Sequence, residues 1–238
     1  MKAMILAAGR GERMRPLTDH LPKPLLEVGG KALVVWHIER LREAGIRDIV
    51  INHAWLGHMI ERALGNGAAL GVRIAYSSEV EALETAGGIA RALPMLGDAP
   101  FVVVNGDVYC AWDFRRAYRA AERLTQSALT AWLVMVANPP QHAHGDFCIS
   151  SGFITDKDLA GAACRFTFSG IGIYRPALFA GVGQGAKAPL APLLRGAMAQ
   201  KRVAGELFDG AWTDVGTPQR LRALDAALHL AHAAHEQA

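Results

Sequence analysis

The stretch Leu6-Ala-Ala-Gly-Arg-Gly-Glu-Arg-Met-Arg-Pro-Leu-Thr18, with Pro22-Lys-Pro24 just after it, decides the fold. It follows an apolar run at 2–7 that predicts a buried strand. Gly9 and Gly11 allow a turn in which backbone N–H groups can approach a phosphate. Ligands of open α/β sheets bind beyond the carboxyl ends of the strands, so this loop predicts an anion site there.

The loop matches neither of two well-known phosphate-binding fingerprints. A dinucleotide fingerprint needs a third glycine where this chain has Met14, and a P-loop needs Gly-Lys-Ser/Thr, which is absent. Arg13 and Lys23 instead predict a longer cationic loop that reaches successive phosphates of a nucleoside triphosphate. Proline on both sides of Lys23 restricts the backbone and aims that side chain. The alternative is a flexible basic surface loop.

Outward from this loop, strand-like apolar runs alternate with helical patterns. We expect strands at 2–7, 48–52, 72–76 and 101–105, with helices at 33–44, 57–64 and 86–93, the last ending at Pro94. Repeated strand–helix–strand units predict an α/β fold with a Rossmann-like, doubly wound, mostly parallel but mixed sheet and helices on both faces.

The second half has a different pattern. We expect a helix at 113–124, a strand at 128–136, a loop at 138–145, paired strands at 146–154 and 165–174, and helices at 190–200 and 217–235. The paired strands predict a small β-hairpin lid inserted in the α/β core. No linker or low-complexity tract divides the chain, so we expect residues 1–238 to form a single domain.

Composition excludes several classes of protein. The chain has 238 residues, of which 51% are hydrophobic and 20% charged, enough for a sizeable core. No run approaches the roughly 18 apolar residues of a membrane span, which predicts a soluble, unexported protein. The net charge of +3 does not favour nucleic-acid binding. The cations do cluster near the N-terminus and predict a local anion site, at Lys2, Arg10, Arg13, Arg15, Lys23 and Lys31.

The cysteines predict neither a disulfide framework nor a zinc site. They are odd in number and lack Cys-x-x-Cys spacing: Cys110, Cys148 and Cys164. A reducing cytoplasm fits this pattern best.

The glycine-rich loop resembles the signature of the sugar-1-phosphate nucleotidylyltransferases, which make nucleotide sugars from a nucleoside triphosphate and a sugar phosphate. Within that family the chain most resembles the bacterial N-acetylmuramate-1-phosphate uridylyltransferases. The likeness extends along nearly the whole chain, through Val50-Ile-Asn-His-Ala-Trp-Leu-Gly57, Leu83-Glu-Thr-Ala-Gly-Gly88, Asn105-Gly-Asp107, Gly145-Asp-Phe147, Phe168-Ser-Gly170 and Trp212-Thr-Asp-Val-Gly-Thr217. It implies a nucleotide-binding half at 1–110 and a sugar-binding half with the C-terminal helix at 111–238.

The resemblance implies a Mg²⁺ site at Asp107 and Asp214. On their own, two carboxylates so far apart in sequence are weak evidence for a metal, and an aspartate after a strand is more often a helix cap, as we expect for Asp113. The resemblance also places Lys23 on the α-phosphate and the sugar phosphate, and Arg13 on the departing pyrophosphate.

The resemblance further implies nucleotide contacts at Ala8, Gly9, Gly11, Asn52, Thr85, Gly87, Gly88 and Asn105. Taken alone, Leu83–Gly88 more readily indicates a helix start capped by Thr85. Sugar contacts are implied at Gly145, Asp146, Thr167, Ser169 and Gly170. Ser150–Phe153 lacks the acidic residue that relatives often carry after the Gly-Asp turn. A lactyl carboxylate on the sugar favours a cationic pocket, to which His142 or His144 could contribute.

Together these features predict a Mg²⁺-dependent, cytoplasmic enzyme, a monomer or small homo-oligomer. It would transfer UMP from UTP to N-acetylmuramate 1-phosphate, and nucleic acid and membrane are not expected partners. One rival is another sugar-1-phosphate nucleotidylyltransferase, using glucose, mannose or heptose 1-phosphate with UTP or GTP. A rival of another class is a non-catalytic nucleotide-sugar sensor.

Overall fold

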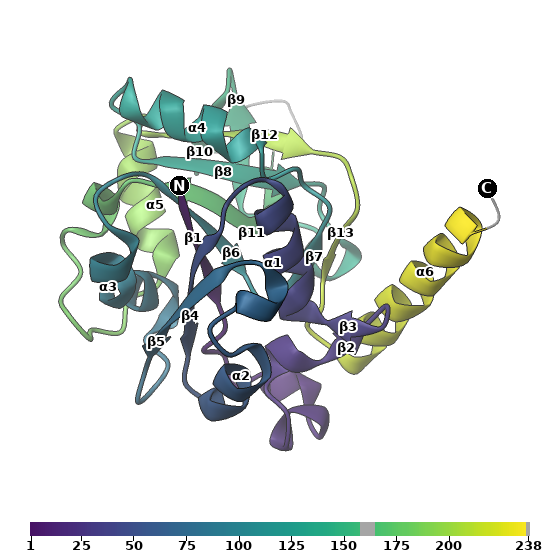
Figure 1. The fold of residues 1–238 in the computed structure, drawn as a ribbon. Helices are drawn as coiled ribbons and strands as arrows, with labels where there is room; N and C mark the ends of the chain where they lie inside the picture. The colour runs from purple at the N-terminus through teal and green to yellow at the C-terminus, as the bar shows by residue number, and fades with distance from the viewer. Residues whose placement is uncertain (158–164, 237–238) are drawn as a thin grey trace.

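A nine-stranded sheet forms the centre of the computed structural model, which describes residues 1–157 and 165–236 (Figure 1). Its strand order is β5-β4-β1-β6-β11-β8-β12-β10-β9. The first four are parallel, as predicted, with bounds Arg73–Ser78 (β5), Asp48–His53 (β4), Lys2–Leu6 (β1) and Phe101–Asn105 (β6). The rest are Arg165–Tyr174 (β11), Ala131–Val136 (β8), Val203–Phe208 (β12), Phe153–Thr155 (β10) and Phe147–Ser150 (β9).

Helices cover both faces of the sheet because side chains alternate along each strand. In β6, Val102 and Val104 face one core, whereas Phe101 and Val103 face the other. The first core includes buried residues of α1 (Leu33–Glu43), α2 (Gly57–Leu64) and α4 (Arg116–Thr125). The second includes those of α3 (Glu84–Leu96) and α5 (Leu190–Ala199). The predicted doubly wound, mixed α/β fold is therefore confirmed.

The last helix, α6 (Pro218–Glu236), extends away from the sheet (Figure 1). Its first half packs on a two-stranded hairpin, β2 (Glu27–Val28) and β3 (Lys31–Ala32), through a small separate core that includes Leu224. The described part of the chain contains no helix both long and apolar enough to cross a membrane.

The helix after β5 does not end at Pro94. It continues through that residue to Leu96, and Gly97 follows with a φ of 83°. Proline removes one backbone hydrogen bond. Burial of Ile89, Ala92 and Leu96 against the sheet keeps the helix intact despite that loss.

The predicted paired strands belong to the central sheet rather than to a separate layer. Residues 146–154 form two strands, β9 and β10, joined by a tight turn, and β9 also pairs with the start of β11. Pairing therefore runs from β11 through β8, β12, β10 and β9 and returns to β11. The sequence analysis missed β12, whose Gly205 and Glu206 interrupt the apolar pattern.

Cys110 is free and buried, whereas Cys148 is disulfide-bonded, which the cysteine pattern did not predict. Cys164 lies outside the described residues. The cysteines therefore give no support to a reducing compartment.

A buried histidine links α1 to β7 (Val108–Cys110), the short strand that follows β6. The ring of His37 is fully buried, and its Nε2–H donates to the carbonyl oxygen of Val108 at 2.7 Å. Burial lowers the pKa of His37 to about 4, because the charged imidazolium loses its hydration.

This pKa predicts a specific loss of stability in acid. The unfolded chain takes up a proton on His37 near pH 6.5 and the folded chain only near pH 4, so the free energy of unfolding falls as pH decreases between these values, by up to about 3 kcal/mol. In urea unfolding at several pH values, His37→Gln is expected to flatten this dependence, whereas exposed His20→Gln is not. An unchanged slope in His37→Gln would show that other groups cause it.

Candidate active site

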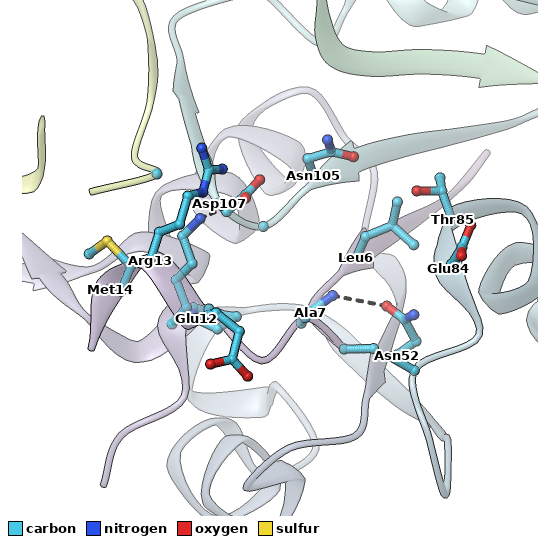
Figure 2. Close-up of a pocket in the computed structure, with 18 residues that line it drawn as sticks. Leu6, Ala7, Glu12, Arg13, Met14, Asn52, Glu84, Thr85, Asn105 and Asp107 are labelled. Carbon is cyan, nitrogen blue, oxygen red and sulfur yellow. Dashed lines mark hydrogen bonds and ion pairs between the residues drawn. The ribbon is translucent and has the colours of Figure 1, made fainter. Parts of the chain in front are cut away.

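A cavity of about 370 Å³ opens at the carboxyl ends of β1, β4 and β6 (Figure 2). Arg13 and Asp107 lie together at one end of the labelled group, and Glu84 and Thr85 lie at the other, at the start of α3. Nine of the predicted residues line this cavity: Ala8, Gly9, Gly11, Arg13, Lys23, Asn52, Thr85, Asn105 and Asp107. The structure thus brings together most of the predicted nucleotide and catalytic residues.

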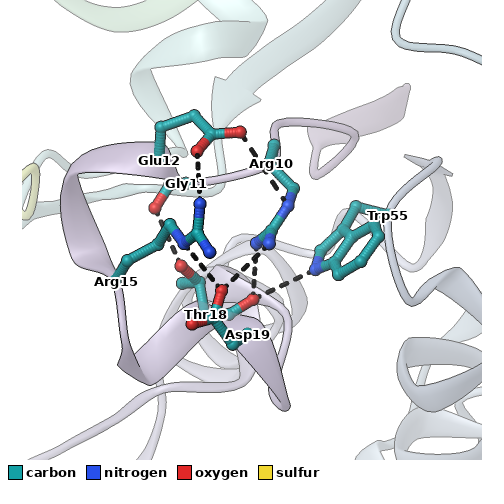
Figure 3. Close-up of polar contacts among 7 residues, drawn as sticks. All are labelled: Arg10, Gly11, Glu12, Arg15, Thr18, Asp19 and Trp55. Atoms are coloured by element: carbon teal, nitrogen blue, oxygen red, sulfur yellow. Dashed lines mark hydrogen bonds and ion pairs between the residues drawn. The ribbon is translucent and has the colours of Figure 1, made fainter.

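The glycine-rich loop is held in shape by its own charges (Figure 3). Arg10 and Arg15 both pair with Asp19, at 3.0 and 2.8 Å. The hydrogen bond from Arg10 holds the pKa of the Asp19 carboxyl below its usual value. Arg10 also donates to the carbonyl oxygen of Thr18, and its guanidinium lies 3.8 Å from the ring centroid of Trp55. These two arginines therefore fold the loop.

Only two of the clustered N-terminal cations line the cavity. Lys31 pairs with Glu39, and Lys2 bonds a backbone carbonyl. Arg13 is exposed and forms no ion pair within the described residues. Lys23 is 7% exposed, and its Nζ donates to Oδ2 of Asp107 at 2.6 Å. Of the six clustered cations, Arg13 and Lys23 therefore remain as candidates for binding an anion in the cavity.

Asp107 and Asp214 are neighbours across a two-stranded ladder. Asp107 precedes β7, and Asp214 ends β13 (Trp212–Asp214), which runs antiparallel to β7 with Asp214 opposite Val108. The N–H of Val215 donates to the carbonyl oxygen of Asp107 at 3.0 Å. The backbones of Asp107 and Asp214 are therefore neighbours, although 106 residues separate them in the sequence.

This pair fits Mg²⁺, which takes one or two carboxylates and completes its coordination with water and phosphate oxygens. Within the described residues, no group of three or more His, Cys, Asp or Glu side chains could hold a metal ion. A metal at Asp107 and Asp214 would therefore depend on oxygen ligands from outside the protein, as a triphosphate provides.

Arg220 is a site residue that the sequence analysis missed. Its Nη2 lies 3.0 Å from Oδ2 of Asp214, and the Nε and Nη2 atoms are buried without a hydrogen-bond partner in the described structure. A Cβ on Gly216 would lie 2.1 Å from Nη2 of Arg220 and 3.1 Å from Nη2 of Arg13. The signal was an arginine in the first turn of α6, where a cation opposes the helix dipole and needs an anion nearby.

Asn52 links several elements at the edge of the cavity. Its Oδ1 accepts from the N–H of Ala7 at 2.9 Å (Figure 2), and its Nδ2 donates to Oε1 of buried Glu79 at 2.7 Å. The other oxygen of Glu79 accepts from the N–H of Leu83, just before α3. Asn52 therefore fixes β1 to the start of α3 and borders the cavity at the same time.

Gly87 and Gly88 do not line the cavity. A Cβ on Gly87 would lie 2.3 Å from the carbonyl oxygen of Ala186, and one on Gly88 would lie 2.8 Å from Asn52 and Glu79. Close packing of α3 accounts for both glycines, and contact with a base stays a prediction. Thr85 lines the cavity but does not cap the helix. Beside it, Glu84 adopts a φ of 61°, a strained conformation for a residue with a side chain.

A second cavity of about 440 Å³ adjoins the first, because Glu84, Thr85 and Asn105 line both. Of the predicted sugar residues, Asp146 lines it. One oxygen of Asp146 accepts from the N–H of Phe168 at 2.8 Å, and the other lies 3.1 Å from Nε2 of His142. The remaining lining residues are Phe147, Phe168, Pro189, Leu190, Ala191, Leu194 and Arg195.

The other predicted sugar residues lie behind this wall. Thr167 is buried and donates to Asn138, and a Cβ on Gly145 would meet the same Asn138 side chain at 2.6 Å. Ser169 is buried, and its Oγ accepts from the N–H of Ile171. These residues shape the bulge of β11 between Phe168 and Ile171, and their direct contact with a sugar stays a prediction.

Gly170 is required by the position of Asn105. Its φ is 84°, and a Cβ there would lie 2.8 Å from Nδ2 of Asn105. We expect Gly170→Ala to lower the free energy of unfolding by about 1–3 kcal/mol. Gly181→Ala, where a Cβ meets nothing within 4 Å, is the matched control. Urea unfolding measures both, and equal stability of the two variants would contradict the packing argument.

Comparison with known proteins agrees with this geometry. Residues 2–152 match the nucleotidyl transferase family model. The chain is 56% identical to an N-acetylmuramate alpha-1-phosphate uridylyltransferase of Neisseria meningitidis, over 95% of this chain and 97% of the other. It is 36% identical to a protein of the same name from Caulobacter vibrioides, over 95% and 96% of the two chains.

Among solved structures, a candidate glucose-1-phosphate thymidylyltransferase from Bacillus anthracis superposes with a TM-score of 0.81 at 22% identity. The superposition covers 96% of this chain and 95% of the other, and it shows that the fold is shared. Because the family model matches more than half of this chain, the chain belongs to the nucleotidyl transferase family.

Proposed function

We propose that the protein transfers UMP from UTP to N-acetylmuramate 1-phosphate, giving UDP-N-acetylmuramate and pyrophosphate. The observation that carries the proposal is that Arg13, Lys23 and Asp107 line one cavity, and that Asp214 lies next to Asp107 in the ladder of β7 and β13. The identity of 56% to the Neisseria protein supports the choice of substrates. The adjoining cavity offers room for a sugar on the far side of Asn105.

The reaction exchanges one phosphorus–oxygen bond for another. A phosphate oxygen of the sugar 1-phosphate attacks the α-phosphorus of UTP, and the bond from that phosphorus to the bridging oxygen breaks, releasing pyrophosphate with its electron pair. The nucleophile is already an anion, so no general base is required. Positioning and charge neutralisation are the tasks left to the protein.

Lys23 and Arg13, the two cations that line the cavity, suit these tasks. Lys23 is buried, and its ammonium can bridge the α-phosphate and the sugar phosphate, bringing two anions together. Arg13 is unpaired within the described residues and presents a planar fork of donors that matches the departing pyrophosphate. Arg10 and Arg15 hold the loop that carries Arg13.

Asp107 and Asp214 would hold Mg²⁺, which neutralises phosphate charge when bound. In the described structure each carboxylate is paired with a cation, Asp107 with Lys23 and Asp214 with Arg220. These pairs hold both carboxylates in place. We also propose a cytoplasmic location, because nucleoside triphosphates are cytoplasmic metabolites.

The substrates are tested by a panel. We expect pyrophosphate release to be fastest with UTP and N-acetylmuramate 1-phosphate, and slower with GTP or with glucose, mannose or heptose 1-phosphate, because the two cavities must be filled together. A coupled pyrophosphate assay with Mg²⁺ measures each pair. Preference for another pair would replace the proposed substrates, and no turnover with any pair would favour a nucleotide-sugar sensor.

The metal and charge assignments are tested by Asp107→Asn. Asparagine keeps an oxygen that can accept from Lys23, so we expect the melting temperature to stay within about 2 °C while kcat falls about 1000-fold. Removal of Mg²⁺ with a chelator is expected to abolish wild-type turnover. Asp113→Asn is the control, because Asp113 pairs with Arg115 outside the cavity. Near-normal turnover in Asp107→Asn would remove this carboxylate from the mechanism.

A further inference from the structure

The cavity beside Asn105 has one feature that the reaction itself does not use. Arg195, on α5, is the one cation among the described residues that line it. The helix around this arginine is otherwise uncharged, and Leu190 and Leu194 beside it form part of the same wall. A guanidinium beside an apolar wall is well suited to bind an anionic group of a ligand.

Two contacts restrain the guanidinium, although the Arg195 side chain is 53% exposed. Its Nε donates to Oδ2 of Asp156 at 2.9 Å, and its central carbon lies 5.9 Å from the centroid of the buried Phe147 ring. Neither Nη group has a hydrogen-bond partner in the part of the chain that the structure describes. Two parallel donors therefore remain on a side chain whose orientation is already restrained.

The acidic groups of the same cavity do not compete for these donors. Asp146 uses one oxygen for the N–H of Phe168 and the other for His142. Glu84 lines both cavities and lies beside Thr85 (Figure 2). Asp156, which faces Arg195, is shared with Arg165 at 3.6 Å. Among the described residues, Asp156 is thus shared between two arginines.

Neither histidine expected to provide positive charge lines the cavity. His142 pairs with Asp146, and both His142 and His144 are exposed. Arg195 supplies a charge that is permanent at physiological pH, because guanidinium groups do not deprotonate there.

We propose that Arg195 determines sugar specificity by binding the carboxylate of an acidic substituent on the sugar phosphate. The proposal rests on the proposed function. N-acetylmuramate differs from N-acetylglucosamine by a lactyl ether that carries one carboxylate, so the Nη fork of Arg195 has a partner in the first sugar and none in the second. Discrimination between these two sugars is therefore assigned to this side chain.

The test compares the two sugar phosphates in wild-type protein and in Arg195→Met, which keeps an apolar stem of similar length. We expect the variant to lose about tenfold to hundredfold in kcat/KM with N-acetylmuramate 1-phosphate and to stay within about twofold with N-acetylglucosamine 1-phosphate. The loss should lie mainly in KM, because the carboxylate takes no part in bond making. If turnover of the neutral sugar is too slow, calorimetric dissociation constants replace kcat/KM for both sugars.

Three further variants make the outcome specific. Arg195→Lys keeps the charge without the planar fork and should lose less than the methionine variant. Asp156→Asn keeps an acceptor for Nε and should retain the preference for the acidic sugar. Arg91→Met removes an exposed arginine of α3 that lines neither cavity. This variant should leave kcat/KM unchanged with both sugar phosphates.

The results that overturn the proposal are distinct from failure of the proposed function. Equal losses with both sugars in Arg195→Met would assign Arg195 a general structural role, and no loss with either would remove it from recognition. If wild-type protein turns over other sugar phosphates but neither turns over nor binds N-acetylmuramate 1-phosphate, the proposed substrate is wrong, and the assignment of Arg195 falls with it.

Discussion

The ion pair between Lys23 and Asp107 is the interaction on which the rest of the site depends. The Lys23 side chain is almost completely buried, and a buried ammonium needs an acceptor, so its hydrogen bond to Oδ2 of Asp107 fixes where the segment after the glycine-rich loop meets the end of β6. The loop in turn is stiffened by Asp19, which holds Arg10 and Arg15. One buried charge therefore sets the position of the whole anion-binding loop.

Around this pair, positively and negatively charged side chains lie close together. Asp214 faces Arg220, and Arg13 lies beside both near Gly216. A triphosphate with its metal ion adds charge of both signs to such a site, so the carboxylates and cations can exchange partners without leaving a buried charge unpaired. This arrangement suits a site that must bind, react and release a polyanion.

The two halves of the central sheet differ in strand direction, and each borders a different cavity. In the parallel half, the carboxyl ends of β1, β4 and β6 meet at one edge and form the first cavity. Beyond β6, strand β11 runs antiparallel to both of its neighbours, β6 and β8, and bulges between Phe168 and Ile171, and β9 pairs back with β11. This closure places the wall that Asp146, Phe147 and Phe168 form next to Asn105.

The sequence by itself determined the α/β class, most strands and helices, the family, and which residues border the nucleotide cavity. Those features depend on local periodicity and on motifs in which neighbours along the chain act together. It did not determine that Asp214 lies beside Asp107 or that Arg10 and Arg15 pair within the loop. Nor did it determine that Gly87 and Gly88 lie in close packing of α3, that Arg195 lines the second cavity, or that Arg220 pairs with Asp214. Only the tertiary structure decided these points, because strand register and ion-pair partners join residues far apart in the chain, and no local pattern specifies which of several equivalent charges will meet.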